Sequence, residues 1–590
     1  FFCFFFFKKR SACLPSPFPY PRETPVWNPA VHTTLRPSGA HLAFGRAPEP
    51  WLDLDLSRTR PATGRQAVAT ANPLASWAAA TMLRQGGSAI DAAIAAQMVL
   101  TLVEPNASGL GGGAVILIHD GAGITTIDGI SAAPARVPER LETDFDGRTV
   151  PVDRATTGGR TVGVPGALRA LDDAHRRFGR LPWKTLFEPA IACATEGFAL
   201  SPYLVRTLLE IPAMRDEPFA RALYCGGTDA PLPPGTMLRN PALAATLRII
   251  ADHGADAFYQ GDLAAQIARA VQSDPFSGTL TLRDMADYRA IERRPATFAL
   301  GANTVATAPL PAYGGIAAGQ LIGLARHRGL TSIGTTLDAG TIHLLAEAGR
   351  VAFADRDPYA DPLTSTADVA HLLAPEYLAR RARHIDPLRR NDKIPPGHTD
   401  RGSDGLGGSM TSHLGIADAH GQVVSMTTTI NQNFGARIAV GGFYLNNVLT
   451  NFALHPVRQG KPQPNAMAPG LRPRTSIAPC IVTDAAGRAV AAVGAGGGYR
   501  IIGYVANALL RLAGGMTDPQ AILSAPHALN WSGMTELEPE HAGHVQALVA
   551  RGHWTSVRRL DGGTQLLLRH AGIWHAGADP RRDGLAMALD

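Results

Sequence analysis

Cysteine is scarce in this sequence, and its spacing argues against two common ways of stabilising a fold. The five cysteines are odd in number and far apart, with no C-x-x-C pair: Cys3, Cys13, Cys193, Cys225 and Cys480. Such spacing favours neither a disulfide framework nor a cysteine-ligated zinc site. We therefore expect no metal and no disulfide framework, and the redox compartment stays open.

Long apolar runs and runs of one charge are also missing. The longest apolar candidate, AIDAAIAAQMVLTLVEP, carries Asp91 and stops at Pro105, and a transmembrane helix needs about 18 uncharged residues or more. Lys and Arg give a net charge of +6 but are scattered, and KKR at 8–10 and RRAR at 380–383 are typical of solvated faces. We expect no membrane span and no nucleic-acid partner.

Several catalytic and cofactor motifs are absent. The sequence has no H-E-x-x-H, no G-x-S-x-G and no G-x-x-x-x-G-K-[ST], which excludes the common zinc proteases, α/β-hydrolases and P-loop proteins. The glycines of 108–121 follow a helix and precede a strand, the reverse of a dinucleotide site, and in 489–510 the third fingerprint glycine is replaced by Tyr499. We expect no cofactor.

What the chain does contain is typical of a packed globular protein, with 590 residues, 45% of them hydrophobic and 18% charged. Residues 1–64 are rich in Pro and Arg and predict a poorly ordered arm; its start, FFCFFFFKKR, puts positive charge after the apolar run, unlike a secretory signal. Residues 65–410 are mostly helical by periodicity and residues 411–590 are rich in strand patterns. The Gly- and Pro-rich segment 389–410 is the strongest boundary between them.

Local signals mark two helices near the start of the folded part. Asn72 followed by Pro73 predicts an N-cap and first helical residue, and Gly86-Gly87 ends that helix. Ser88 with Asp91 predicts a capping box for the next helix.

Two features point to acyl-transfer chemistry. Gly497 and Gly498 precede a predicted helix, where backbone N–H groups can face an oxyanion, although a tight structural turn explains them equally well. Thr411 directly follows the flexible segment; cutting the bond before it would free an α-amine beside its hydroxyl, a base that can activate that nucleophile.

The motifs in combination resemble those of the γ-glutamyltransferase (γ-glutamyltranspeptidase) family of N-terminal-nucleophile hydrolases, over residues 65–590. The segments that carry the resemblance are RQGGSAIDAAIAAQMVLTLVEPNASGLGGG, VGVPGALRALDDAHRRFG, DMADYRAIERRP, PLPAYGGI, AEAGRVAFADR, MTSHLGIAD, TTINQNFGARI, GFYLNN, LRPRTSIAPCIV and GAGGGYRI. The resemblance implies an α+β fold, a four-layer αββα sandwich built by a large and a small chain of one precursor. It also implies an exported, periplasmic location, with the cytoplasm as the alternative.

The resemblance assigns roles residue by residue. Autocleavage between Met410 and Thr411 would free Thr411 as the nucleophile, and Thr429 matches the residue that orients it. Gly497 and Gly498 match the oxyanion-hole glycines. The substrate-binding positions are matched by Asn431, for a polar contact, and by Thr475 and Ser476, for the substrate carboxylate.

The head-group contacts of the family depart from the pattern. Where the family has an Arg, a Gln or Glu and an Asp, this chain has Ile130, Val448 and Asn451. Losing an Arg–carboxylate contact in a buried site costs several kcal/mol of binding, so we expect glutathione to be a poor substrate. The Asp-to-Asn difference resembles the cephalosporin-acylase branch, whose acyl group lacks the α-ammonium.

Three hypotheses follow. The first is a self-processing amide hydrolase or acyltransferase with water or an amine as acceptor; the second is a true γ-glutamyltransferase or glutathione hydrolase whose head-group contacts have moved, for example to Arg437 or Arg474. The third is a catalytically silent scaffold, which would not need the retained catalytic residues. Ser412 is interpreted as filler, and His413 as a structural hydrogen-bonding residue, because a triad also requires an acid.

Overall fold

The computed structural model describes residues 61–590 except 139, 142, 144–148, 152–154, 274–275, 396–409, 454, 459 and 531–532. The predicted arm thus lies outside the described residues as far as residue 60. Its last residues form a short strand, β1 (Ala62–Gly64), which pairs antiparallel with β22. Most of the boundary segment 389–410 also lies outside the described residues.

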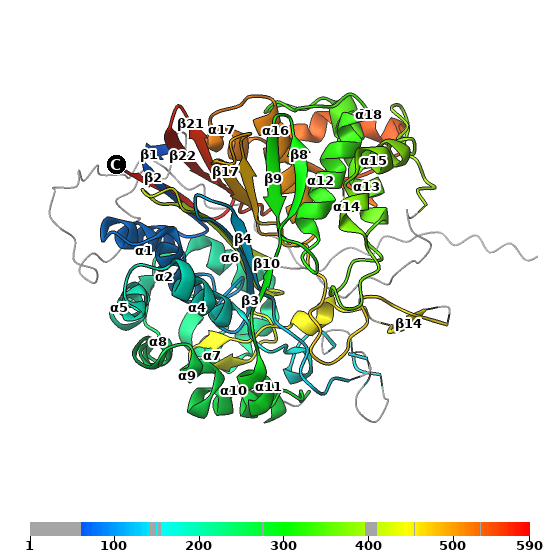
Figure 1. Cartoon of the computed structure of the whole chain (residues 1–590). Helices are drawn as coiled ribbons and strands as arrows, with labels where there is room; N and C mark the ends of the chain where they lie inside the picture. Colours follow the sequence, from blue (N-terminus) through cyan, green and yellow to red (C-terminus); the bar gives the residue numbers. More distant parts are fainter. Residues whose placement is uncertain are drawn as a thin grey trace, which may run out of the picture. The chain divides into compact units, whose positions relative to one another are not determined.

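Two seven-stranded sheets form the centre of the fold (Figure 1). The first has the order β23 (Leu585–Leu589), β2 (Gln66–Thr70), β10 (Met410–Ala417), β11 (Val423–Asn431), β3 (Gly113–His119), β4 (Ile124–Gly129) and β7 (Ile291–Arg293). The second has the order β1, β22 (Ile573–Ala578), β21 (Gln565–His570), β17 (Ala489–Gly494), β16 (Cys480–Thr483), β9 (Asn303–Thr307) and β8 (Ala296–Leu300). All pairings within the two sheets are antiparallel.

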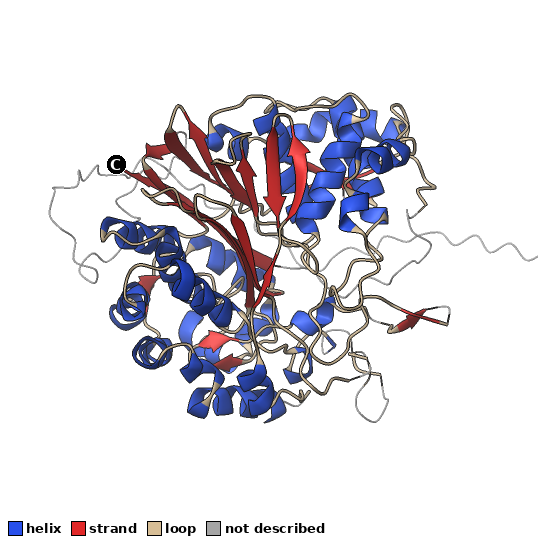
Figure 2. Cartoon of the chain, in the orientation of Figure 1, coloured by secondary structure: helices blue, strands red, loops and turns tan. Residues whose placement is uncertain are grey.

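The two sheets pack face to face with helices outside, as Figure 2 shows. The helices on the side of the first sheet are α1 (Pro73–Arg84), α2 (Ala89–Val103), α4 (Ala167–Phe178), α5 (Glu188–Glu196), α6 (Pro202–Glu210), α7 (Pro218–Tyr224), α8 (Pro241–His253), α9 (Asp256–Tyr259), α10 (Gly261–Ser273) and α11 (Leu282–Asp287). Those on the side of the second are α12 (Gly314–Arg326), α13 (Ala339–Ala354), α14 (Val369–Leu372), α15 (Pro375–Ala382), α16 (Arg500–Ala513), α17 (Pro519–Ser524) and α18 (Val545–Ala550). The expected four-layer αββα sandwich is confirmed.

Short strands form smaller sheets besides the two central ones. They form the pairs β5 (Phe198–Ala199) with β6 (Met237–Leu238), β12 (Ala439–Val440) with β13 (Phe443–Tyr444) and β14 (Val457–Arg458) with β15 (Lys461–Pro462). A three-stranded sheet contains β18 (Ala528–Asn530), β19 (Met534–Leu537) and β20 (Trp554–Val557). These small sheets belong to the segments that connect the main strands and helices, and they do not interrupt the two central sheets.

The local sequence signals explain how the first two helices begin. The Asn72 side chain accepts a hydrogen bond from the N–H of Leu74, which satisfies one of the free donors at the start of α1. Ser88 and Asp91 form the predicted capping box of α2. Every residue of α2 is buried, because the helix packs against both α1 and the first sheet.

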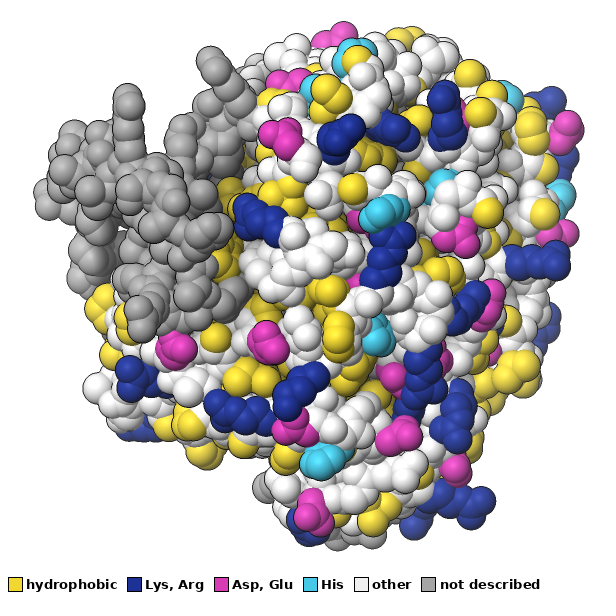
Figure 3. Space-filling view, turned by 60° about the vertical axis from the view of Figure 1, so that its left-hand side comes forward, with side chains coloured by type: hydrophobic (Ala, Val, Ile, Leu, Met, Phe, Trp, Pro, Cys, Tyr) yellow, Lys and Arg dark blue, Asp and Glu magenta, His cyan; other side chains and the backbone are white. Residues whose placement is uncertain are grey.

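Two observations concern the surface charge and the possibility of a membrane-spanning helix. On the face in Figure 3, basic side chains are interspersed with acidic, apolar and neutral ones. No helix within the described residues is both long and apolar enough to cross a bilayer.

Candidate active site

Thr411 lies near the start of β10, a central strand of the first sheet, and is fully buried. Met410 pairs with Asn431 and Ser412 pairs with Thr428, so two residues of β11, Thr429 and Ile430, lie opposite Thr411 alone. This is a β-bulge, a device that re-aims side chains beside functional sites. Thr429 then faces the same inter-sheet side as the nucleophile candidate.

The hydroxyl of Thr429 links Thr411 to the bond before it. It accepts hydrogen bonds from Thr411 Oγ1 at 3.3 Å and from the backbone N–H of Asn431 at 2.8 Å. It donates its own proton to the carbonyl oxygen of Met410 at 2.7 Å. One hydroxyl group thus contacts the candidate nucleophile and polarises the carbonyl that the nucleophile would attack.

The predicted glycine turn lies beside Thr411. It connects β17 of the second sheet to α16, and an added Cβ on Gly496 would lie 2.0 Å from the carbonyl oxygen of Thr411. Gly497 and Gly498 follow with φ angles of +116° and +64°, a region that favours glycine. The turn therefore needs glycine for both conformation and space, and it reaches the nucleophile from the opposite sheet.

A buried arginine that the sequence patterns did not single out also contacts Thr411. Arg582 Nη1 donates to the Thr411 carbonyl oxygen at 2.8 Å, and Nη2 donates to the Asp561 carbonyl oxygen at 3.2 Å. The guanidinium lies over the ring of Tyr203, with 5.3 Å between its central carbon and the ring centroid. The site thus contains a fixed positive charge next to the nucleophile residue.

Ser412 and His413 lie on opposite faces of β10 and do not form a pair. Ser412 Oγ donates to the buried carboxylate of Glu104, at the end of α2, so its interpretation as filler is wrong. The His413 ring bonds Thr427 Oγ1 at 2.9 Å and packs against Gly494 of β17. Burial lowers the pKa of His413 to about 3, which keeps the imidazole neutral and fits the structural role expected of it.

Two of the three head-group positions, Ile130 and Val448, belong to apolar clusters. Ile130 and Val448 are buried, and Asn451 is partly exposed. Val448 belongs to a small apolar cluster between the loops after β4, β13 and β15, formed by Ala133, Leu141, Val448, Leu449, Phe452 and Leu471. The Asn451 carbonyl oxygen accepts a hydrogen bond from Asn465 at 2.8 Å. None of the three positions carries a charge.

The remaining substrate-binding candidates are buried polar residues. The Asn431 amide nitrogen donates to the Asn447 carbonyl oxygen at 3.1 Å and to Thr450 Oγ1 at 2.8 Å, while its Oδ1 has no partner among the described residues. Thr475 and Ser476 precede β16, and the Thr475 backbone is bonded to residues 311–313, before α12. The segment before α12 thus fixes the backbone of Thr475.

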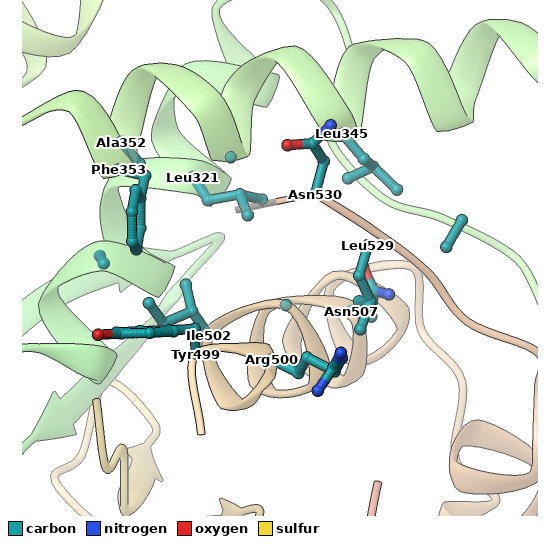
Figure 4. A pocket seen from close by; sticks show the side chains of 14 residues that line it. Leu321, Leu345, Ala352, Phe353, Tyr499, Arg500, Ile502, Asn507, Leu529 and Asn530 are labelled. Atoms are coloured by element: carbon teal, nitrogen blue, oxygen red, sulfur yellow. The ribbon is translucent and has the colours of Figure 1, made fainter. Parts of the chain in front are cut away.

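A small cavity lies behind the glycine turn, between α12, α13, α16 and β18 (Figure 4). Its lining includes Tyr499 and Arg500, which follow the turn directly, and Phe353 and Asn530. The volume of about 20 Å³ holds roughly one water molecule, so the cavity has no room for an acyl group. Within the described part of the chain, no group of three or more His, Cys, Asp or Glu side chains is arranged to bind a metal ion.

The αββα sandwich described above is the fold of the N-terminal-nucleophile hydrolases. Residues 75–589 match the family model described as Gamma-glutamyltranspeptidase. The chain belongs to the γ-glutamyltranspeptidase family, whose members are hydrolases and transferases.

Individual relatives include two kinds of enzyme. The chain is 35% identical to the glutathione hydrolase proenzyme of Pseudomonas aeruginosa, over 74% of this chain and 77% of the relative. It is 34% identical to the acylase ACY 1 proenzyme of Pseudomonas sp. strain SE83, over 90% of this chain and 95% of the relative. The crystal structure of cephalosporin acylase from Bacillus halodurans matches with a TM-score of 0.77 and 26% identity, over 90% of this chain and 96% of that one.

Proposed function

We propose that this chain is a precursor that cuts its own Met410–Thr411 bond and then uses Thr411 as an N-terminal nucleophile. In the first step, Thr411 Oγ attacks the carbonyl carbon of Met410, the hydroxyl proton is transferred to the amide nitrogen of Thr411, and the C–N bond breaks to give an ester and a free α-amine. Water then hydrolyses the ester, leaving a carboxylate on Met410 and a free hydroxyl on Thr411.

The hydrogen bond from Thr429 to the Met410 carbonyl oxygen is the observation that carries this proposal. A donor aimed at this oxygen stabilises the negative charge that develops there during attack. The same Thr429 oxygen accepts from the Thr411 hydroxyl, which orients the nucleophile beside the bond. A scaffold without chemistry would not require this arrangement.

After cleavage, the same hydroxyl would attack the amide of a substrate. The free α-amine of Thr411, with an ordinary pKa of about 7.7 to 8.0, serves as the base that takes the hydroxyl proton. The substrate amine leaves with a proton, and water or another amine releases the acyl group. The turn of Gly497 and Gly498, whose neighbour Gly496 lies against the Thr411 carbonyl oxygen, would supply the backbone N–H groups that stabilise the oxyanion.

We further propose that the acyl group lacks the α-carboxylate and α-ammonium of a γ-glutamyl group. An unpaired charge among neutral side chains costs several kcal/mol, and Ile130, Val448 and Asn451 offer no charged partner. The apolar cluster around Val448 favours an uncharged part of the substrate at this place. The near full-length match to an enzyme named acylase supports the same substrate class.

The first experiment is denaturing electrophoresis with intact-mass measurement of the purified protein. We expect two fragments, the second beginning at residue 411, in the wild type and in Thr411→Ser, and one uncut chain in Thr411→Ala. A wild type that stays whole under all conditions would overturn the proposed function.

The second experiment compares substrates on the processed protein. We expect hydrolysis of p-nitroanilides of simple carboxylic acids and poor hydrolysis of γ-glutamyl-p-nitroanilide. The double variant Ile130→Arg/Asn451→Asp should shift this preference toward the γ-glutamyl substrate, because it restores two charges of the family pattern. A wild type with a micromolar KM for γ-glutamyl-p-nitroanilide would instead favour a glutathione hydrolase whose contacts have moved.

A further inference from the structure

Glu104 is a buried carboxylate directly behind the nucleophile strand. It is the C-cap residue of α2, with 1% of its surface exposed, and one of its oxygens accepts the hydrogen bond from Ser412 Oγ. The other oxygen, Oε1, has no hydrogen-bond partner among the described residues. Buried carboxylates are rare, and burying one without a full set of partners lowers the stability of the fold. The position of Glu104 therefore calls for an explanation.

Its partner Ser412 immediately follows Thr411. The side chains of successive strand residues point to opposite faces, so Glu104 holds β10 from the helix side while the Thr411 hydroxyl faces the second sheet. Arg582 binds the carbonyl oxygen of Thr411 itself. The peptide group joining Thr411 to Ser412 is therefore held at both ends, next to the bulge.

Three ionisable residues from two segments of the chain lie around Glu104. Arg582 and Asp583 follow β22, and Tyr203 lies on α6. Burial raises the pKa of Glu104 to about 7, against the opposing effects of the Arg582 charge and the Ser412 hydrogen bond, while Asp583 raises it further. Glu104 thus changes charge within the pH range in which enzymes of this family class would be assayed.

We propose that Glu104 is a positioning residue for the nucleophile: its ionised carboxylate, through Ser412 and together with Arg582, holds Thr411 in the geometry required for attack on the Met410 carbonyl. The proposal rests on the self-cleavage proposed above. Glu104 itself touches neither the reacting atoms nor the substrate, so it acts only through its neighbours.

Protonation of Glu104 weakens this arrangement. An ionised carboxylate is a stronger acceptor for Ser412 than a neutral one and pairs electrostatically with Arg582. Below pH 7 the hydrogen bond from Ser412 and the attraction to the Arg582 charge both weaken, and misplacement of a reacting group by about 1 Å lowers a rate by roughly a hundredfold. The self-cleavage rate should therefore rise with pH through about 7.

The experiment measures self-cleavage of full-length chain made in a short cell-free translation and then diluted into buffers from pH 5 to 9. Gel samples over time give the rate for the wild type, Glu104→Gln and Ser412→Ala. Glu347→Gln is the matched control, since Glu347 is another wholly buried carboxylate, paired with Arg350 on α13.

We expect Glu104→Gln to cut about ten- to a hundredfold more slowly at pH 8, with no rise in rate between pH 6 and 8. Ser412→Ala should be slowed similarly, and adding it to Glu104→Gln should have little further effect. Glu347→Gln should keep the wild-type rate and pH profile.

The outcomes separate the two proposals. A Glu104→Gln chain that cuts with the wild-type rate and pH profile overturns the positioning role and leaves the self-cleavage standing. Equal slowing of Glu104→Gln and Glu347→Gln, with both pH profiles unchanged, would show a general effect of losing a buried carboxylate and would also overturn it. A wild type that never cuts removes the proposed function itself.

Discussion

The buried carboxyl of Glu104 should make the stability of this protein depend on pH in a direction opposite to that of most carboxylates. Its pKa is raised from 4.5 to about 7 by burial, so the folded state binds the proton more tightly than the unfolded state. The stabilisation is fully present below pH 4.5, falls as the pH rises and is gone above about pH 7. The side chain is wholly buried, so solvent screening does not reduce the effect.

The magnitude follows from the shift. A rise from 4.5 to about 7, at about 1.4 kcal/mol per pH unit, amounts to roughly 3 kcal/mol of unfolding free energy. Gln does not titrate, so Glu104→Gln lacks this pH dependence. The intrinsic cost or gain of the substitution is the same at every pH and cancels when two pH values are compared.

The assay is urea unfolding followed by far-UV circular dichroism, with Thr411→Ala in both proteins so that the chain stays whole. We expect the unfolding free energy of the Glu104 protein, relative to that of Glu104→Gln, to fall by about 3 kcal/mol between pH 4.5 and pH 9. Other carboxylates titrate equally in both proteins. A difference that is constant with pH, or that grows as the pH rises, would refute the reasoning.

Three further predictions concern the surroundings of the nucleophile. Gly494→Ala places a Cβ 2.3 Å from the His413 ring and should lower the unfolding free energy by about 1 to 3 kcal/mol, measured by thermal unfolding. Gly123→Ala, whose Cβ would meet no atom within 4 Å, is the control and should not lower it. Equal stability of the two variants would contradict the close packing of Gly494 against His413. Arg582→Lys keeps the charge but loses the two guanidinium N–H groups that bind the carbonyl oxygens of Thr411 and Asp561. Self-cleavage in a timed gel assay should therefore slow about tenfold. An unchanged rate would show that Arg582 does not position Thr411. Because burial keeps His413 neutral above about pH 3, His413→Gln should leave the shape of the pH–rate profile of amide hydrolysis unchanged between pH 5 and 9. If the rise or fall of the rate with pH disappeared in this variant, His413 would be identified as a catalytic base.

The parts of the fold that were predictable from sequence depend on neighbouring residues. The caps at Asn72 and Ser88 act within three residues, and the glycines at the end of β17 precede a helix whose periodicity is plain. The bulge opposite Thr411 was not predictable, because it is a property of the pairing between β10 and β11 and leaves no pattern in either strand.

The partners of the nucleophile strand were missed for a different reason. Glu104 lies 308 residues before Ser412, and Arg582 lies 171 residues after Thr411. Each residue in isolation resembles many other charged residues, and only the packing of α2 and the β22 loop onto β10 brings them together. One signal was available for Glu104: a charged residue at the end of a mostly apolar helix stretch, next to Pro105.

The order of strands in the two sheets has a consequence for the life of the protein after cleavage. Strands from before and after Met410 pair with one another in both sheets: β2 lies between β23 and β10 in one sheet, and β9 and β1 flank the later strands in the other. A cut at Met410 would therefore leave two polypeptides that can separate only by breaking both sheets. Once separated, they must find each other by diffusion, so recovery of the fold would become dependent on protein concentration. The uncut chain can fold in a unimolecular reaction. The processed enzyme would keep the same fold, but after unfolding it could no longer easily refold.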